Sequence, residues 1–131
     1  MGRVLMKAVI GTIILVIIFF IGATVFQNYV QNGCEELSEE ITKLEGYIDD
    51  ENWEMTRETL GLLKEDWEEK SKIWVLFLEH YNLDAIEVAI RKIDTYSDLK
   101  DKTYTLGEIV KLRYLIEHLS EREAFVLSNL L

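Results

Sequence analysis

The chain has 131 residues, and its 24 Asp and Glu residues against 14 Lys and Arg give a formal net charge of −10 at pH 7. A negative field of this kind repels phosphates, so nucleic acids and anionic lipid headgroups are disfavoured as partners. A single cysteine excludes an internal disulfide framework, and the absence of proline with only 7 glycines leaves no long flexible linker.

Residues 8–26, AVIGTIILVIIFFIGATVF, contain no charged side chain. As a helix this stretch would extend about 28 Å, close to the ~30 Å hydrocarbon thickness of a bilayer. It therefore predicts a transmembrane signal anchor. A cleaved signal peptide is the alternative, but Ile21, two positions before Ala23, makes a poor cleavage site. Attachment as a lipoprotein through Cys34 is less favoured again, because polar residues precede that cysteine.

Basic residues indicate the orientation of this span. Arg3 and Lys7 precede it, whereas the next basic residue is Lys43. By the positive-inside rule, residues 1–7 are predicted to be cytoplasmic and everything after Phe26 to be exported. The expected location is the cell membrane, with a single pass and an extracytoplasmic C-terminal domain.

A polar neck is expected at residues 27–34, between the span and an exported domain at residues 35–131. Cys34 ends this neck and would lie near the outer membrane surface. The sequence leaves two roles open for it, an ordinary thiol or an intermolecular disulfide across a dimer.

Apolar residues at helical spacing predict the first helix of the exported domain over residues 35–49. The acidic DDEN segment then breaks the pattern, and Asn52 has the residue type of an N-cap for the next helix. Acidic residues beside a helix start also suit its dipole. The predicted apolar stripe of the first helix is Leu37, Ile41, Leu44 and Ile48.

All three tryptophans share one heptad register, which predicts a helix over residues 52–80 with this stripe packed in the core. Most of the other residues in the segment are charged or polar. The positions spaced by seven are Trp53, Leu60, Trp67, Trp74 and Tyr81, and the intervening ones are Thr56, Leu63, Lys70 and Phe77.

A ligand or interaction face is the alternative for the same stripe, at Trp67, Trp74, Phe77 and Tyr81. Such a site would need convergent polar groups beside the indoles, and the stripe offers only Lys70. Core packing is therefore favoured, and no cofactor is expected.

Two further helices follow. Asn82 is expected to cap the third, and residues 97–103, SDLKDKT, to form the next loop. Thr105 and Glu108 have capping-box spacing for the fourth helix, and a start one turn earlier is also compatible. The predicted stripes are Leu83, Ile86, Ile90 and Ile93, then Ile109, Leu112, Ile116, Leu119, Val126 and Leu130, with Glu123 as a polar intruder.

Short loops between consecutive helices favour antiparallel neighbours. The predicted fold is all-α, an N-terminal transmembrane helix followed by an antiparallel up-and-down helical bundle. Residues 73–78, IWVLFL, are apolar all round and need cover on every side, from the other helices or from a partner or the membrane surface. The apolar ending AFVLSNLL predicts a docked C-terminus.

Catalytic and metal-binding patterns are missing from the sequence. His80 and His118 each follow a glutamate directly, which is not the Glu-x-x-His spacing of di-iron bundles. There is no HExxH motif, no Gly-x-Ser-x-Gly turn and no glycine-rich phosphate loop. The sequence predicts neither an enzyme nor a metal site, and it assigns His80 a capping or hydrogen-bonding role at the end of the second helix.

The tryptophan stripe, the segment EHYNLDAIEVAI and the ending SEREAFVLSNLL resemble a family of small bacterial proteins labelled domain of unknown function 4363. The resemblance covers nearly the whole chain. It implies an N-terminal anchor and a helical exported part in a Gram-positive spore former, and it transfers no catalytic residue. The matching positions are Trp53, Trp67, Trp74, His80, Asp84 and Asn129.

The expected function is that of a membrane-anchored, non-enzymatic interaction or accessory protein of the bacterial cell or spore envelope. Its expected partner is another envelope membrane protein or a second copy of the chain. The alternative function is a small-molecule sensing or carrier bundle with a cleft near Trp67, Trp74 and Tyr81.

Overall fold

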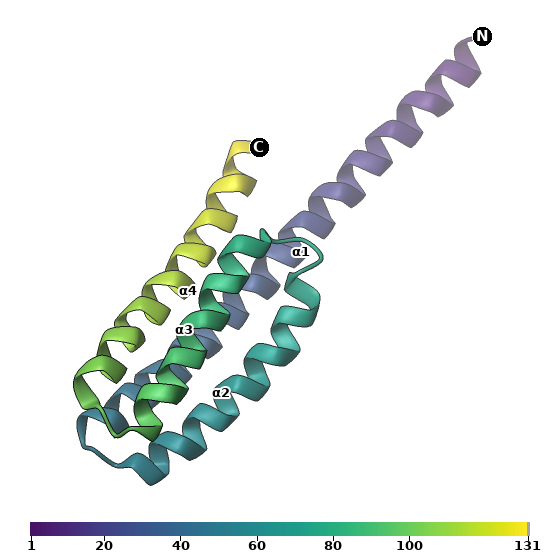
Figure 1. Cartoon of the computed structure of the whole chain (residues 1–131). Helices are drawn as coiled ribbons and strands as arrows, with labels where there is room; N and C mark the ends of the chain where they lie inside the picture. Colours follow the sequence, from purple (N-terminus) through teal and green to yellow (C-terminus); the bar gives the residue numbers. More distant parts are fainter. Residues whose placement is uncertain (131) are drawn as a thin grey trace.

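The structure is a computed structural model that describes the backbone of residues 1–130 and the side chains of residues 1–122. Over the described backbone it is all-helical, with four helices and no strand. The helices are α1 (Gly2–Asp49), α2 (Trp53–Trp74), α3 (His80–Asp98) and α4 (Lys102–Leu130), as Figure 1 shows.

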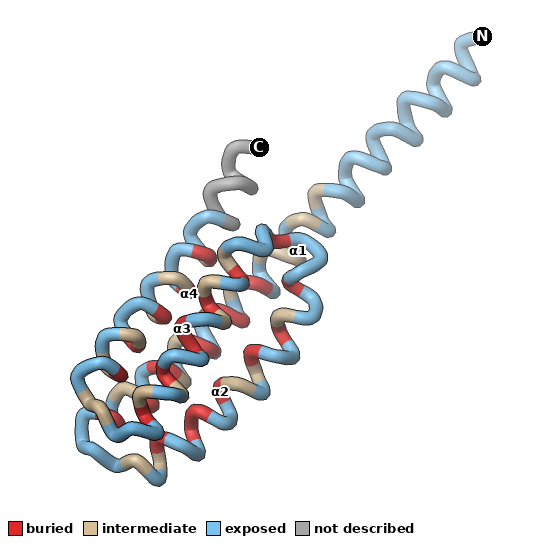
Figure 2. Tube along the Cα trace, in the orientation of Figure 1, coloured by how far each residue is buried: buried red, intermediate tan, exposed pale blue. Residues whose placement is uncertain are grey.

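α1 is one continuous helix of 48 residues that joins the apolar N-terminal stretch to the bundle. The expected polar neck, residues 27–34, is therefore helical, and the first bundle helix does not begin at Glu35. No proline interrupts this region and no glycine has a positive φ, so the backbone has no helix-breaking feature there. Val30 is already buried in the core, whereas residues 1–19 are exposed (Figure 2).

α1 is the one helix, within the described residues, that is long and apolar enough to cross a membrane. None of its most apolar window is buried inside the structure. By length and composition it has the character of a membrane anchor or a signal sequence.

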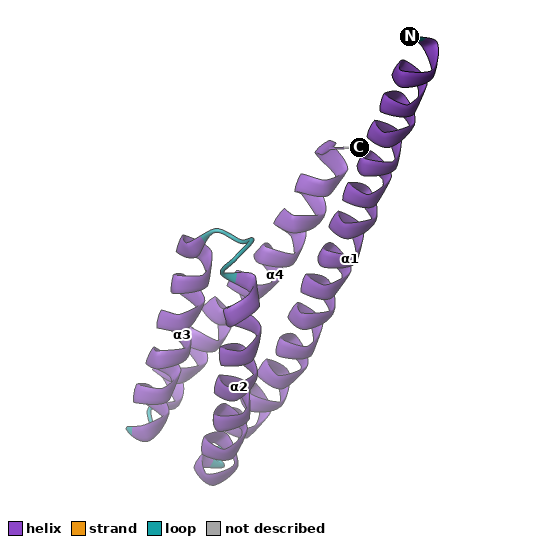
Figure 3. Ribbon diagram, turned by 90° about the vertical axis from the view of Figure 1, so that its right-hand side faces the viewer, coloured by secondary structure: helices purple, strands orange, loops and turns teal. Residues whose placement is uncertain are grey.

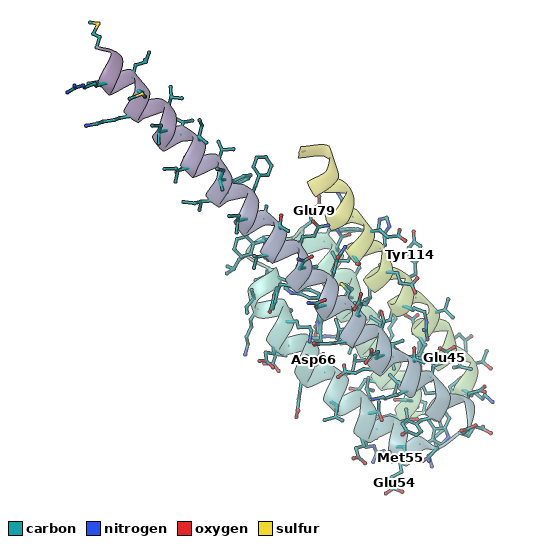
Figure 4. All side chains as sticks on the ribbon, turned by 180° about the vertical axis from the view of Figure 1, so that it is seen from behind. Glu45, Glu54, Met55, Asp66, Glu79 and Tyr114 are labelled. Carbon is teal, nitrogen blue, oxygen red and sulfur yellow. The ribbon has the colours of Figure 1, made fainter. Side chains whose placement is uncertain are left out.

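In the bundle, α1 packs against α2 and α4, and α3 packs against α4 and α2. The loop at residues 75–79 lies at the end of the bundle from which α1 projects, and the loops at 50–52 and 99–101 lie at the opposite end (Figures 1 and 3). We refer to these as the near end and the far end. Figure 4 shows Glu79 at the near end, with Glu54 and Met55 at the far end.

Apart from Trp53, which is partly buried, and Phe77 and Tyr81, which are exposed, the apolar stripe residues with described side chains form the core of the bundle. This confirms the helical periodicity in all four segments. Val126, Leu130 and Glu123, and the C-terminus expected to be docked, fall outside the described side chains. The buried stripe residues are Leu37, Ile41, Leu44, Ile48, Leu60, Leu63, Trp67, Trp74, Leu83, Ile86, Ile90, Ile93, Ile109, Leu112, Ile116 and Leu119.

α2 ends at Trp74, so the prediction of one helix over residues 52–80 is wrong at its C-terminal end. The backbone N–H of Leu78 donates to the Trp74 carbonyl at 2.8 Å, and the Leu78 side chain turns back into the core. Trp74 is the last core residue of α2, and the chain reverses after it so that α3 packs back along α2 and α4. Phe77 and Tyr81 lie beyond this reversal and are therefore not part of the buried stripe.

The two far-end loops have the same design. In each, one residue has a φ of 55°, Glu51 in the first loop and Lys100 in the second. The following residue, Asn52 or Asp101, caps the next helix. Its side-chain oxygen accepts a hydrogen bond from the backbone N–H three residues on, at 3.2 Å and 3.1 Å respectively. The predicted Asn52 cap is confirmed.

The starts of the last two helices differ from the capping predictions. α3 begins at His80, before Asn82, and the residue preceding it, Glu79, makes no side-chain capping hydrogen bond. α4 begins at Lys102, which matches the earlier of the two starts considered for it. Asp101 caps this helix in place of Thr105, whose side chain is buried.

Candidate functional site

The four residues proposed as an interaction or ligand face do not come together. Trp67 and Trp74 are buried in the core, where their rings meet edge to face with centroids 6.1 Å apart. Phe77 and Tyr81 are 67% and 80% exposed at the near end. The interpretation of the two tryptophans as core residues is confirmed, whereas the exposed Tyr81 does not pack with them in the core.

Trp67 nevertheless borders a groove of about 400 Å³ between α2 and α3. Its indole Nε1 donates to Glu87 Oε2 at 2.7 Å, and Arg91 Nε donates to Glu87 Oε1 at 3.1 Å. The polar walls of the groove are thus largely paired with one another. Its lining residues are Lys64, Trp67, Glu68, Ser71, Glu87, Ile90, Arg91 and Asp94.

Trp74 packs directly on the backbone of α1. A Cβ built on Gly33 would lie 2.6 Å from Trp74 Cζ2, closer than real Cβ contacts allow. Gly33 therefore admits the indole between α1 and α2. The Trp74 Nε1 is buried and has no hydrogen-bond partner among the described residues.

Lys70, the polar residue within the tryptophan stripe, is buried in a cluster of carboxylates between α1 and α2. Its Nζ donates to Glu36 Oε2 at 2.8 Å and also bonds Asp66. Burial alone would lower the pKa of Lys70, but the hydrogen bonds to Asp66 and Glu36 outweigh burial and raise it. The lysine therefore stays charged and links the two helices.

Glu40 is the fourth member of this cluster. Burial raises the pKa of Glu40 from 4.5 to about 7, with a further contribution from the negative charge of Asp66 that Lys70 only partly offsets. Its Oε2 is buried without a hydrogen-bond partner among the described residues. Near neutral pH the Glu40 carboxyl is thus partly protonated, and the cluster can take up or release a proton.

This cluster is absent from the sequence-based predictions, although Lys70 is a visible signal of it. A lysine within an apolar heptad stripe needs acidic partners. Asp66 lies one turn earlier on the same helix and could have been inferred from the spacing. Glu36 and Glu40 come from α1, and their pairing with Lys70 depends on how α1 and α2 pack.

The two histidines occupy exposed positions. His80 is the first residue of α3 and does not belong to the end of α2 as expected. His118 stacks on the ring of Tyr114, with the centroids 5.7 Å apart. Among the described residues, no group of three or more His, Cys, Asp or Glu side chains could hold a metal ion.

Cys34 is 3% exposed and lies in the core, facing the other helices. A disulfide to a second chain would require this part of α1 to separate from the bundle. The position of Cys34 therefore favours an intact thiol over the intermolecular bridge.

The α2–α3 loop, residues 75–79, contains most of the apolar segment at residues 73–78. The sequence left open whether the other helices, or a partner or the membrane surface, would bury this segment. Val75, Leu76 and Phe77 are exposed, and Leu78 alone of the apolar loop residues is buried. The other helices thus leave Val75, Leu76 and Phe77 exposed. The Phe77 ring contacts Phe26 of α1, with the centroids 4.7 Å apart.

Comparison with the curated proteins and with the solved structures finds no match. The chain does match a protein family described as "Domain of unknown function (DUF4363)" over residues 24–130. The match takes in the whole described bundle, including the tryptophan stripe, the Lys70 cluster and the α2–α3 loop. The chain belongs to this family.

Proposed function

We propose that the protein is a single-pass membrane protein of the bacterial cell or spore envelope, with a cytoplasmic N-terminus and an extracytoplasmic antiparallel up-and-down bundle. In this proposal residues 8–26 span the bilayer as an uncleaved anchor. Arg3 and Lys7 before the span, with no basic residue after it until Lys43, support the orientation.

The continuity of α1 is the observation that carries the proposal. Its exposed apolar half and its buried bundle half form one helix, which spans about 72 Å at ~1.5 Å per residue. No loop separates the two halves, so the bundle is held at a fixed distance from the bilayer surface. The buried face of α1 from Val30 onward makes the anchor an integral part of the folded domain.

We propose that the bundle acts by binding another envelope membrane protein or a second copy of itself, and that it is not an enzyme. The buried polar groups support a structural role for the interior. Lys70 bonds Glu36 and Asp66, and Trp67 bonds Glu87, so these groups hold helices together. The acidic exposed faces favour a partner surface with basic residues.

A topology experiment tests the anchoring part of this proposal. Protease added to cells with permeable walls should digest the chain after Phe26 and leave a tag placed before Arg3 protected. The reverse pattern of digestion would overturn both the orientation and the envelope location.

A partner experiment tests the interaction part. The full chain, crosslinked in intact cells and gently solubilised, should be recovered in a complex with a membrane protein or as an oligomer. Recovery of the monomer alone, after crosslinking that captures a known membrane complex in the same cells, would contradict the proposal.

A ligand-binding role remains a second candidate because of the groove beside Trp67. The indole forms part of the wall of this groove and donates to Glu87 across it. A ligand that displaced this hydrogen bond should change the tryptophan emission saturably, and Glu87→Gln should weaken the effect. Emission that does not change in titrations with envelope metabolites would argue against this role.

A further inference from the structure

The α2–α3 loop differs from an ordinary helix–helix connection in its surface. Such connections are usually rich in polar and turn-forming residues. Here Val75, Leu76 and Phe77 are consecutive, and all three side chains are exposed, with Leu76 at 72%. No charged residue occurs in residues 73–78. A contiguous exposed apolar surface of this kind marks a contact with a non-aqueous partner.

The contact between Phe77 and Phe26 fixes the height of the loop along α1. Phe26 is the last residue of the apolar stretch at residues 8–26, and its ring centroid lies 4.7 Å from that of Phe77. If residues 8–26 fill the hydrocarbon layer, the loop lies at the outer boundary of that layer. The continuous helix leaves no linker that could shift the loop away from this level.

The residues around the loop suit this boundary. Tyr29 on α1 and Tyr81 on α3 are both exposed near it, and tyrosine is enriched where the hydrocarbon meets the headgroups. The acid that ends the loop, Glu79, is paired with Arg122 at 2.7 Å. This pairing lowers the cost of bringing the carboxylate close to an apolar phase.

We propose that the α2–α3 loop inserts into the outer surface of the bilayer that α1 spans, so that the bundle is attached at two points. The inference rests on the proposed membrane anchoring. A second protein chain is a poorer occupant, because three side chains fall far short of the roughly 800 Å² per partner that a stable interface buries. The bilayer, in contrast, is already present at this level of α1.

The test uses the full chain reconstituted in phosphatidylcholine vesicles. An environment-sensitive fluorophore is attached at Leu76→Cys, and the vesicles contain a lipid with a nitroxide quencher near the headgroup end of its acyl chain. Leu99→Cys is the matched control, a leucine of nearly the same exposure, 71%, in the far-end loop. Ile17→Cys reports insertion of the span, and the parent chain, whose Cys34 is buried, gives the labelling background.

The expected result is strong quenching at position 76 by the shallow nitroxide, weaker quenching there by a nitroxide near the methyl end, and none at position 99. Quenching at position 17 without quenching at 76 would overturn the loop insertion and leave the anchor intact. Absence of quenching at position 17 by the nitroxide near the methyl end, which lies at the depth of the middle of the span, would overturn the membrane anchoring itself. Equal quenching at 76 and 99 would mean that the bundle lies flat on the membrane, which contradicts attachment at two points.

If a second copy of the chain covered the loop instead of the bilayer, the fluorescence would differ. The label at position 76 would then emit as if in an apolar environment, escape the lipid quencher and return to a polar emission when the protein is diluted into excess lipid. That outcome overturns the proposal in favour of an interface between copies.

Discussion

The far-end loops and the α2–α3 loop connect helices of one bundle, yet they are built from different residue types. At the far end, Glu51 and Lys100 take the same left-handed conformation, and Asn52 and Asp101 cap the helices that follow. At the near end, five residues make the connection, four of them are apolar, and no side chain caps α3. Both far-end loops satisfy their backbone groups with short polar side chains, as loops in water do.

The difference indicates that the two ends of the bundle face different surroundings. The surroundings change along α1 as well. Its buried face begins at Val30, just after the exposed apolar stretch ends. The near end therefore combines a tightly packed interior around Trp74 with an apolar outer surface. Substitutions at each end can show whether the two ends differ in surface only or in packing as well.

The largest effect is expected from Trp74→Ala. Trp74 is fully buried at the near end, so its removal leaves a cavity and should cost about 3–5 kcal/mol of unfolding free energy. Trp74→Phe should cost much less, because a phenyl ring keeps most of the apolar volume and the Nε1 has no hydrogen-bond partner among the described residues to lose. Thermal unfolding of the full chain in detergent micelles, followed by circular dichroism, measures both.

The far-end comparison for this variant is Ile48→Ala, which should cost about 2–5 kcal/mol because Ile48 is also fully buried. If the near end is as well packed as the far end, both alanine variants will melt well below the parent. A Trp74→Ala chain that melts with the parent while Ile48→Ala does not would show a loosely packed near end.

Two glycines of α1 give the next effect and should act in opposite directions. Gly33→Ala would place a Cβ 2.6 Å from Trp74 Cζ2, and overpacking of this kind costs about 1–3 kcal/mol. Gly46→Ala, nearer the far end, meets no atom within 4 Å and should stabilise the helix by roughly 0.5–1 kcal/mol. The same unfolding measurement applies, and a rise in melting temperature for Gly33→Ala would mean that Trp74 does not pack on that glycine.

Helical periodicity was sufficient to predict most of the fold. Where side chains are described, the stripes were correct except at Phe77 and Tyr81, because each helix buries one face and exposes the other. Periodicity could not show that α1 continues through residues 27–34, since a polar segment that is only partly buried carries a weak pattern. It also extended the second helix as far as His80, because the heptad spacing of Phe77 and Tyr81 continues past the point where the chain reverses.

The candidate sites were less predictable for the same reason. The carboxylates around Lys70 come from two helices, and the sequence contains many other acids at similar spacings. The exposure of Leu76 and Phe77 depends on where α2 ends, which periodicity placed too late. The buried face of each helix could thus be predicted from the sequence, whereas the contacts between side chains of different helices could not.

A smaller effect is expected from the pH dependence of the Lys70 cluster. Glu40 loses its proton near pH 4.5 in the unfolded chain and near pH 7 in the folded one, so the folded state holds the proton between these values. The contribution of Glu40 to stability is therefore present below pH 4.5 and is lost as the pH rises through 7. The shift sets an upper limit of about 3 kcal/mol, which solvent at this half-buried site reduces to the order of 1 kcal/mol.

Glu40→Gln removes this titration and isolates its effect. The difference in melting temperature between Glu40→Gln and the parent chain should grow in favour of the variant from pH 5 to pH 8. Glu39→Gln is the control, because Glu39 is an exposed neighbour on the same helix. Parallel pH profiles for the parent and Glu40→Gln would contradict the raised pKa.

The smallest effect concerns the loops themselves. Lys100 has a φ of 55°, a conformation that side chains with a Cβ disfavour and glycine adopts freely. The backbone N–H groups of Lys100 and Asp101 donate to the carbonyls of Ser97 and Tyr96, at 2.9 Å and 3.0 Å, so Lys100 occupies the position where glycine usually ends a helix. Glycine would relieve a left-handed strain of about 1–2 kcal/mol and add about 0.5–1 kcal/mol of freedom to the unfolded chain, so Lys100→Gly should raise the unfolding free energy by up to about 1 kcal/mol.

The near-end counterpart is Leu76→Gly. The structure has no positive φ in the α2–α3 loop, so glycine relieves no strain there and adds freedom to the unfolded chain. The full chain in micelles should melt at a higher temperature with Lys100→Gly and at a lower one with Leu76→Gly. The decrease in melting temperature caused by Leu76→Gly should be larger in phosphatidylcholine vesicles than in lipid-free conditions that keep the bundle folded. In the vesicles the leucine also contributes contact with the bilayer. A loss for Leu76→Gly that is the same with and without lipid would show that the loop is built for a chain reversal alone.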